Sequence, residues 1–353
     1  MKTTDKALKS NFVPVCTGTG LVALDVIISG ISDMPTQFLA GGSCGNVMTI
    51  LSYLGWSSHP IARISNNVAS ELLLQDLKTW NVKDDLIDVS ETGSTPIIIH
   101  RIMKDQSGVP KHRFEFKNPE DGKYLPMYKP TLAKSVDVIF NKLPNPNVFY
   151  FDRINRGALD LAKAYKSQGA VIFFEPSSIK EEKQFMECLE IADVIKFSND
   201  RISNYSNLFP IGKAKLEIQT LGNDGLQFRT EGYSNWTKLE SYSIENVVDS
   251  AGAGDWCSAG IIMNLFNNKN STIEDITTAQ LAYALQFGQA LSALNCTFEG
   301  ARGLMYNLTK TELMLYVQHI VSSHTKKISK RRSTNNFHGK HFDMKISSLF
   351  AAV

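Results

Sequence analysis

A run of small residues ends on an acid in the last third of the chain. Residues 247–262 read VVDSAGAGDWCSAGII, so that Gly252, Ala253 and Gly254 precede Asp255. Small residues let backbone N–H groups approach an anion, and the helix that follows adds unpaired donors and a positive dipole end. A carboxylate beside such a cradle is suited to deprotonate a hydroxyl that attacks the γ-phosphoryl group of a nucleotide. The alternative is a tight turn in which Asp255 only caps the helix.

Two further glycine clusters come earlier in the chain. Residues 40–46 (AGGSCGN) precede an expected helix, and Asn46 offers both a donor and an acceptor to hydroxyl groups. An ordinary helix-capping loop is the alternative interpretation of this cluster. Residues 220–225 (TLGNDG) follow an expected strand and can turn tightly beside a nucleotide.

Short strand patterns alternate with helical patterns, which favours a mostly parallel sheet covered by helices. The buried strand patterns lie at 21–28, 148–151, 171–174, 194–197 and 216–221. The helical patterns lie at 46–53, 69–80, 158–168, 182–191, 254–266 and 278–294, the last two being the final long helices expected. Two extended runs, 97–103 and 111–116, are joined by DQSG and predict a β-hairpin that forms a flap over one edge of the sheet.

Taken in this order, the glycine clusters resemble the signatures of the PfkB family of ribokinase-like carbohydrate kinases. The segment DSAGAGD at 249–255 is similar to the C-terminal D-T-x-G-A-G-D, with Ser in place of Thr, and G-G-x-x-x-N at 41–46 is similar to the N-terminal signature. T-x-G-x-x-G at 220–225 resembles the nucleotide-side turn, and ADVIK at 192–196 resembles the strand leading to the metal-phosphate region. With Gly300-Ala301 matching the end of the pattern, the resemblance spans about residues 15–304.

The resemblance implies an α/β fold, a ribokinase-like three-layer sandwich with a central, mostly parallel sheet and a small β lid. The kinase domain would span 12–320, with the lid contributed mainly by 26–40 and 95–118. Residues 321–353 would form a basic C-terminal tail, which we expect to be flexible.

The resemblance also implies roles for individual residues, with ATP and Mg²⁺ as cofactors and K⁺ as a further cation. Asp255 would be the catalytic base, and the anion hole would comprise Gly252, Ala253 and Gly254. The residues expected to bind the sugar are Asp25, Gly41, Gly42 and Asn46. Those expected on the nucleotide side are Lys196, Ser198, Thr220, Gly222 and Gly225. A monovalent cation would be held through Asp249 and Ala251.

Two stretches depart from the family pattern. The N-x-x-E segment, whose Glu orients a Mg²⁺-bound water in the family, reads KFSNDRI at 196–202, and the Glu position holds Arg201 or Ile202 depending on the register. Asp200 could substitute for it, or Arg201 could contact phosphate directly. The D-P after the mid-chain strand is replaced by E-P at Glu175. A nucleoside kinase is therefore the alternative to a sugar kinase, and a non-catalytic, ligand-binding member is the alternative from another class.

The charge balance separates the body from the tail. The 353 residues carry a net +2, but the 33 residues from Val321 onward contribute +6, which leaves −4 for the body. A near-neutral chain gives no argument for nucleic acid or an anionic membrane. Five scattered cysteines, a polar start and no long apolar run predict a cytoplasmic protein without disulfides or a membrane span. We expect a small-molecule substrate and, from the resemblance, a homodimer formed through the lid.

Overall fold

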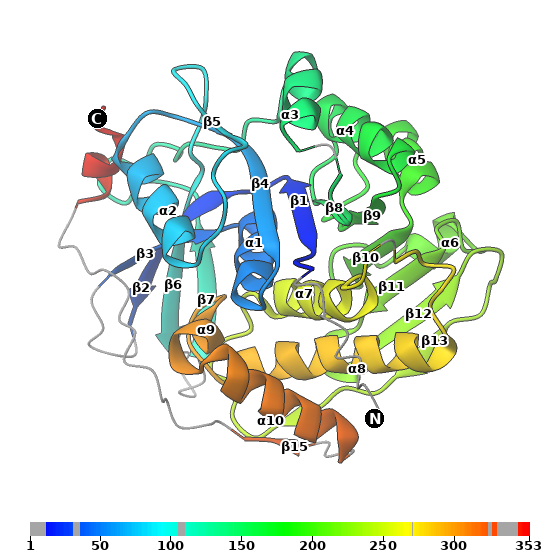
Figure 1. The fold of residues 1–353 in the computed structure, drawn as a ribbon. Helices are drawn as coiled ribbons and strands as arrows, with labels where there is room; N and C mark the ends of the chain where they lie inside the picture. Colours follow the sequence, from blue (N-terminus) through cyan, green and yellow to red (C-terminus); the bar gives the residue numbers. More distant parts are fainter. Residues whose placement is uncertain are drawn as a thin grey trace, which may run out of the picture.

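The structure is a computed structural model, and it describes residues 12–30, 36–104, 110–143, 145–269, 271–323, 327–329 and 345–353. Its centre is a nine-stranded sheet with the strand order β13-β12-β11-β10-β9-β8-β1-β4-β5 (Figure 1). Neighbouring strands are parallel from β5 to β11, while β12 and β13 are antiparallel. The strands are β1 (Val15–Thr19), β4 (Ser57–Ile64), β5 (Ile87–Val89), β8 (Val148–Phe151), β9 (Val171–Phe174), β10 (Val194–Ser198), β11 (Leu216–Thr220), β12 (Leu226–Thr230) and β13 (Thr237–Leu239).

Helices cover both faces of this sheet, as Figure 1 shows. They are α1 (Ser43–Tyr53), α2 (Val68–Thr79), α3 (Val136–Lys142), α4 (Arg156–Ser167), α5 (Glu182–Ile191), α6 (Tyr205–Leu208), α7 (Ala253–Leu265), α8 (Thr278–Asn295), α9 (Gly303–Asn307) and α10 (Lys310–Ser322). Strand β8 shows how the layers form. Val148 and Tyr150 join the core beside α1, α7 and α8, whereas Phe149 and Phe151 join the core beside α4 and α5. A strand buried on both faces reads as a continuous apolar run, so the three-layer arrangement predicted from the sequence is confirmed.

A second, four-stranded sheet has the order β3-β2-β6-β7. It consists of β2 (Ala23–Ser29), β3 (Gln37–Gly41) and the expected hairpin, β6 (Ile97–Lys104) with β7 (Pro110–Glu115). Leu24 and Val26 point into the main core with α2, whereas Asp25 and Ile27 alternate to the opposite face. The two sheets are therefore joined through one face of the small sheet, and on its other face Ile27, Leu39 and Ile102 form a small buried cluster with Tyr306.

Several elements depart from the sequence-based expectations, and three of them bear on the reasoning. The strand expected at 21–28 begins later, at Ala23, because β1 and the turn after it precede it. Strand β4 was not anticipated, since the short run SSHPIARI contains a proline and polar residues. Helix α10 follows the two helices expected to be the last, and its capping box, in which Thr309 and Glu312 bond reciprocally, was the signal that could have revealed it.

The described parts of the C-terminal tail pack against the body. β15 (Lys327–Ile328) pairs with β14 (Ser243–Ile244), and a 3₁₀ turn at Ile346–Phe350 lies beside α2. Ile346 and Leu349 are buried, because the otherwise polar tail ends in apolar side chains that lose exposure on docking. Residues 330–344, which hold most of the basic run, lie outside the described residues. Among the helices that the structure describes, none is long and apolar enough to span a membrane.

Candidate active site

The glycine-rich loop before α7 has a backbone that only glycine fits. Gly252 is the N-cap of α7 and has a φ of 72°, in the left-handed region. A Cβ at this position would also lie 2.1 Å from the carbonyl oxygen of Ala301. The loop therefore reaches the N-terminus of α7 without side chains in the way, and it leaves the first-turn N–H groups beside Asp255.

Asp249, at the start of this loop, holds the loop together. Its carboxylate accepts from the backbone N–H of Ala251 at 2.7 Å and from that of Gly300 at 2.8 Å. The carbonyl of Ala251 accepts from the side chain of Asn295 at 3.1 Å. These contacts hold the loop in place, and a monovalent cation at Asp249 and Ala251 stays a prediction.

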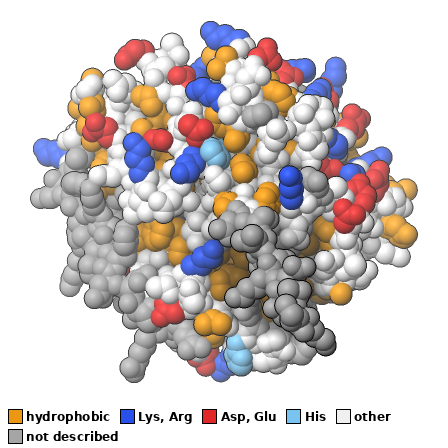
Figure 2. Space-filling model, viewed as in Figure 1, with side chains coloured by type: hydrophobic (Ala, Val, Ile, Leu, Met, Phe, Trp, Pro, Cys, Tyr) orange, Lys and Arg blue, Asp and Glu red, His pale blue; other side chains and the backbone are white. Residues whose placement is uncertain are grey.

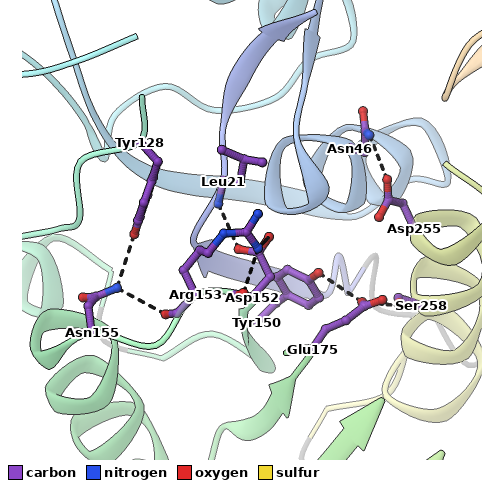
Figure 3. Close-up of polar contacts among 10 residues, drawn as sticks. All are labelled: Leu21, Asn46, Tyr128, Tyr150, Asp152, Arg153, Asn155, Glu175, Asp255 and Ser258. Carbon is purple, nitrogen blue, oxygen red and sulfur yellow. Dashed lines mark hydrogen bonds and ion pairs between the residues drawn. The ribbon is translucent and has the colours of Figure 1, made fainter. Parts of the chain in front are cut away.

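The two signature segments meet at their polar residues, as Figure 3 shows. Asn46, on the first turn of α1, donates from Nδ2 to Oδ2 of Asp255 at 2.8 Å. Gly42 caps α1 with a φ of 77°, and a Cβ there would lie 2.4 Å from the Leu21 carbonyl. The N-termini of α1 and α7 thus face the same point, although Asn46 and Asp255 are 209 residues apart in the chain.

Asp255 is in an environment that favours its protonated form. Burial, together with the nearby Glu175 carboxylate, raises its pKa to about 8. The hydrogen bond from Asn46 and the ammonium of Lys196 oppose this rise. A carboxyl group with a pKa near the working pH can both accept and release a proton, which is the requirement for a general base.

A buried polar cluster under α7 includes residues whose role sequence reasoning missed. The Glu175 carboxylate, directly after β9, accepts from Tyr150 at 3.0 Å and from Ser258 of α7 at 2.5 Å (Figure 3). Its other oxygen accepts from Lys196, whose ammonium also donates to the Gly254 carbonyl at 3.1 Å. The sequence did offer one signal for Glu175, since it lies at the carboxyl end of a buried parallel strand, where ligand sites form.

Lys196 was expected on the nucleotide side, but its side chain is 2% exposed and is engaged by Glu175 and Gly254. The structure therefore places it beneath α7, where it supports the helix terminus from below. Burial is the largest single effect and acts to lower its pKa, but the combined effects of Glu175, Cys257 and Asp255 outweigh it, so the pKa is raised and the amine keeps its charge.

A second missed carboxylate, Asp152, follows β8. Its side chain is 1% exposed, accepts from the backbone N–H of Leu21 at 2.9 Å and pairs with Arg153 at 3.0 Å. Burial raises its pKa. Nearby, Asn155 caps α4 and donates to Tyr128 (Figure 3). These contacts fix the turn between β1 and β2 next to the start of α1.

Asp25 lies on β2, half-buried, against the turn that opens α1. A Cβ at Gly41 would be only 2.0 Å from the Asp25 carboxylate, so the glycine makes room for it. Burial raises the pKa of Asp25 to about 7, and Arg302 opposes this rise. Asp25 on β2 thus lies beside the Gly41-Gly42 turn that opens α1, and the binding of a sugar by Asp25, Gly41, Gly42 and Asn46 stays a prediction.

The residues expected on the nucleotide side meet at the ends of two adjacent strands. Ser198 and Thr220 are partners in the β10–β11 ladder. Gly222 and Gly225 follow with φ of 58° and 92°, and a Cβ at Gly225 would lie 2.1 Å from the Leu239 carbonyl. The turn is therefore tightly packed where it enters β12.

The carboxylate missing from the N-x-x-E pattern is not restored by a neighbour. Ile202 is buried in the core, whereas Asp200 and Arg201 are exposed. In the part of the chain that the structure describes, no group of three or more His, Cys, Asp or Glu side chains could hold a metal ion. Basic and acidic side chains are interspersed over the described part of the face in Figure 2. The N-termini of α1 and α7 are the features of this site that attract an anion without a metal.

The family model for pfkB family carbohydrate kinases matches residues 33–306. This stretch includes both signature segments, at 41–46 and 249–255, and leaves out Asp25. The chain belongs to the pfkB family of carbohydrate kinases. This pfkB-family enzyme is therefore a phosphotransferase of the sugar-kinase type.

Curated relatives include fructokinases of plants. The probable fructokinase-6, chloroplastic, of Arabidopsis thaliana is 25% identical over 316 residues, covering 81% of this chain and 78% of that protein. The fructokinase of Solanum tuberosum is 24% identical over 321 residues, covering 85% of this chain and 94% of that protein.

Solved structures with the same fold include kinases of different substrates. Fructokinase of Vibrio cholerae, solved with fructose, ADP and calcium, has a TM-score of 0.64 at 17% identity, covering 86% of this chain and 99% of its own. A nucleoside kinase of Burkholderia thailandensis, solved with inosine, has a TM-score of 0.62 at 15% identity, covering 89% of this chain and 100% of its own. At these identities the likeness establishes the ribokinase-like fold, and the choice of substrate requires other arguments.

Proposed function

We propose that this pfkB-family kinase transfers the γ-phosphoryl group of ATP to a hydroxyl group of a sugar or sugar-like small molecule. The observation that carries the proposal is the contact between Asn46 and Asp255 at the facing N-termini of α1 and α7. It places a carboxylate able to accept a proton beside two sets of backbone donors able to bind an anion.

In the proposed reaction Asp255 accepts the proton of the substrate hydroxyl. The resulting oxygen forms a bond to the γ-phosphorus of ATP, while the bond from that phosphorus to the β–γ bridging oxygen breaks and ADP leaves. Backbone N–H groups of the 252–254 loop stabilise the charge on the transferring group, and Asn46 orients the carboxylate of Asp255. Asp25 accepts a hydrogen bond from another substrate hydroxyl.

We propose that the nucleotide binds beside Ser198, Thr220 and the Gly222–Gly225 turn. Bound beside a nucleotide, Mg²⁺ is held largely by phosphate oxygens and water. It would therefore need no cage of carboxylates, and the described residues contain none. When bound in this way, Mg²⁺ would supply charge neutralisation on the phosphates. Neither Asp200 nor Arg201 is assigned to it.

The experiment is an assay for ADP formation from Mg²⁺-ATP with a panel of sugars and nucleosides, run with the wild type and with Asp255→Asn. Turnover of a hydroxyl substrate in the wild type and its near-complete loss in the variant is expected. Saturable binding of a panel member without turnover would favour the non-catalytic, ligand-binding class instead. Near-normal turnover in the variant would exclude Asp255 as the base.

One observation favours a nucleoside as the second candidate substrate. His100 of β6 pairs in register with Phe114 of β7, and their rings stack at 4.8 Å. His100 Nε2 also lies 4.0 Å from Oδ2 of Asp249. The face of the small sheet that carries His100 is therefore turned toward the glycine-rich loop before α7.

Two aromatic side chains stand on that same face. Phe114 and Phe116 are each 54% exposed, and the register of the sheet places them on the face that carries Asp25. An exposed aromatic ring beside a hydroxyl-binding carboxylate can stack on a planar base. Replacing Phe116 by Ala should raise the KM for a nucleoside substrate more than that for a simple sugar, and an equal effect on both would argue against base stacking.

Two further expectations from the sequence stay predictions. A homodimer through the small sheet would use the β7 edge of that sheet, which has no neighbouring strand among the described residues. Light scattering of the purified protein would measure its mass and decide between one and two copies. The cytoplasmic location requires an imaging experiment in the source cell.

A further inference from the structure

An ion pair takes the place of a neighbouring strand at the edge of the small sheet. β3 is an edge strand, so the outward-facing backbone groups of Ala40 have no strand to pair with. Ala40 N–H donates to Asp76 of α2 at 2.9 Å, and its carbonyl accepts from Arg302 Nη2 at 2.5 Å. Arg302 Nη2 also donates to Asp76 at 2.5 Å. The pair therefore fixes the chain just before the Gly41-Gly42 turn.

This ion pair is almost completely removed from water. The Arg302 side chain is 1% exposed and that of Asp76 is 10% exposed. Tyr306 donates to the second oxygen of Asp76 at 3.3 Å. Burying two charges is costly, and the pair offsets part of this cost by satisfying both outward-facing backbone groups of Ala40. An apolar pair could not make these contacts, so the buried charges hold this end of β3 in one position.

Arg302 also belongs to a segment that contacts the glycine-rich loop before α7. Within residues 300–302, the N–H of Gly300 donates to Asp249, and the carbonyl of Ala301 accepts from Trp256 of α7 at 3.1 Å. The same carbonyl leaves no room for a Cβ on Gly252. Three successive residues thus connect the loop before α7 to the edge of the small sheet.

Asp25 is the neighbouring group on which this pair acts. Its carboxylate lies against Gly41, one residue beyond Ala40. Arg302 and Asp76 are the charged groups that act on Asp25, and their effects are opposite: Arg302 lowers the pKa of Asp25 and Asp76 raises it, with the larger effect from Arg302. The other titratable groups facing this region are Tyr306 of α9 and His100 of β6.

We propose that Arg302 is a positioning residue for substrate binding, which fixes the end of β3 against which Asp25 lies and couples this strand to the loop before α7. The proposal rests on the proposed function only in assigning Asp25 to the substrate. Arg302 itself contacts neither the substrate nor the nucleotide.

The first test follows the Asp25 carboxyl directly by ¹³C NMR titration, with the signal assigned through Asp25→Asn. Asp76→Asn removes a negative neighbour and should lower the pKa of Asp25. The double variant Asp76→Asn/Arg302→Met replaces the buried ion pair by a neutral pair and should raise it, because the effect of Arg302 is the larger.

The second test separates binding from catalysis in the double variant. Loss of the charge-assisted contact should raise the KM for the sugar by about tenfold and leave the KM for ATP within about twofold. The matched control is Glu217→Gln/Arg229→Met, which removes another fully buried ion pair, one between β11 and β12. The control should lower the melting temperature and leave the KM for the sugar unchanged.

Opposite pKa shifts together with a selective rise in the KM for the sugar support the proposal. Shifts in the same direction, or an equal rise in KM in the control, overturn it. If the wild type phosphorylates nothing in the panel, the proposed function is wrong, and the NMR titration still decides whether Arg302 controls Asp25.

Discussion

Replacing Asp255 by Asn should abolish turnover and at the same time stabilise the fold. The two side chains have the same shape, and the amide oxygen of the variant can still accept from Asn46, as the carboxylate does at 2.8 Å. The variant can take no proton from a substrate, and loss of a positioned general base typically lowers the rate about 10²–10⁴-fold.

The stabilisation follows from the raised pKa. The pKa of Asp255 is about 8 in the folded protein, while an unfolded Asp has an ordinary value near 4. A carboxyl whose pKa is raised by folding destabilises the native state as the pH rises from the unfolded value to the folded one. The gain from removing this charge is about 1–2 kcal/mol at pH 5 and about 4 kcal/mol at pH 7, and it levels off above pH 8.

The assay combines ADP release with thermal unfolding between pH 5 and pH 9. At about 2.1 cal/mol/K of unfolding entropy per residue, each kcal/mol shifts the melting temperature of this chain by roughly 1.3 °C. The variant should therefore melt about 2 °C above the wild type at pH 5 and about 5 °C above it at pH 7. The wild-type kcat/KM should rise with pH through about 8, because the base must lose its proton.

A matched control is Asp137→Asn, which changes an exposed carboxylate in the first turn of α3. It should leave turnover unchanged and show no rise in melting temperature that grows with pH. The reasoning is refuted if Asp255→Asn keeps more than about a tenth of wild-type turnover. It is equally refuted if the difference in melting temperature does not grow between pH 5 and pH 7.

Three further predictions concern residues around the same site. Gly252→Ala should cost more than about 2 kcal/mol of stability and most of the turnover, whereas Gly232→Ala, at a similar φ of 81° but with open space around it, should cost about 1 kcal/mol; unfolding and activity assays compare them. Lys196→Met leaves Glu175 without its ammonium and should destabilise the fold by about 3 kcal/mol, which Glu175→Gln in the same chain partly restores. An unfolding titration in which the double variant is no more stable than Lys196→Met would contradict this. Asn46→Ala removes a hydrogen bond that lowers the pKa of the base, so the rise of kcat/KM should move above pH 8, and an unmoved profile would count against the contact.

The sequence determined those features that depend on local backbone requirements. A glycine is needed at Gly252 and Gly42 because both have a positive φ, and such positions are visible as signatures. The buried strands VFYF and VIFF could be identified because strands covered on both faces are continuously apolar. The hairpin could be identified from its two extended runs and the turn between them, and the order of these signals was enough to indicate the family.

Only the tertiary structure decided which side chains meet. The approach of Asn46 to Asp255, the contacts of Lys196 with Glu175 and Gly254, and the ion pair of Arg302 with Asp76 each join distant parts of the chain. Their partners depend on strand order and on the packing of helices across the sheet, neither of which is encoded in a short window of sequence. Local backbone conformation can be inferred from a few neighbouring residues, whereas a buried charge acquires its partner, and therefore its pKa, only when the chain has folded.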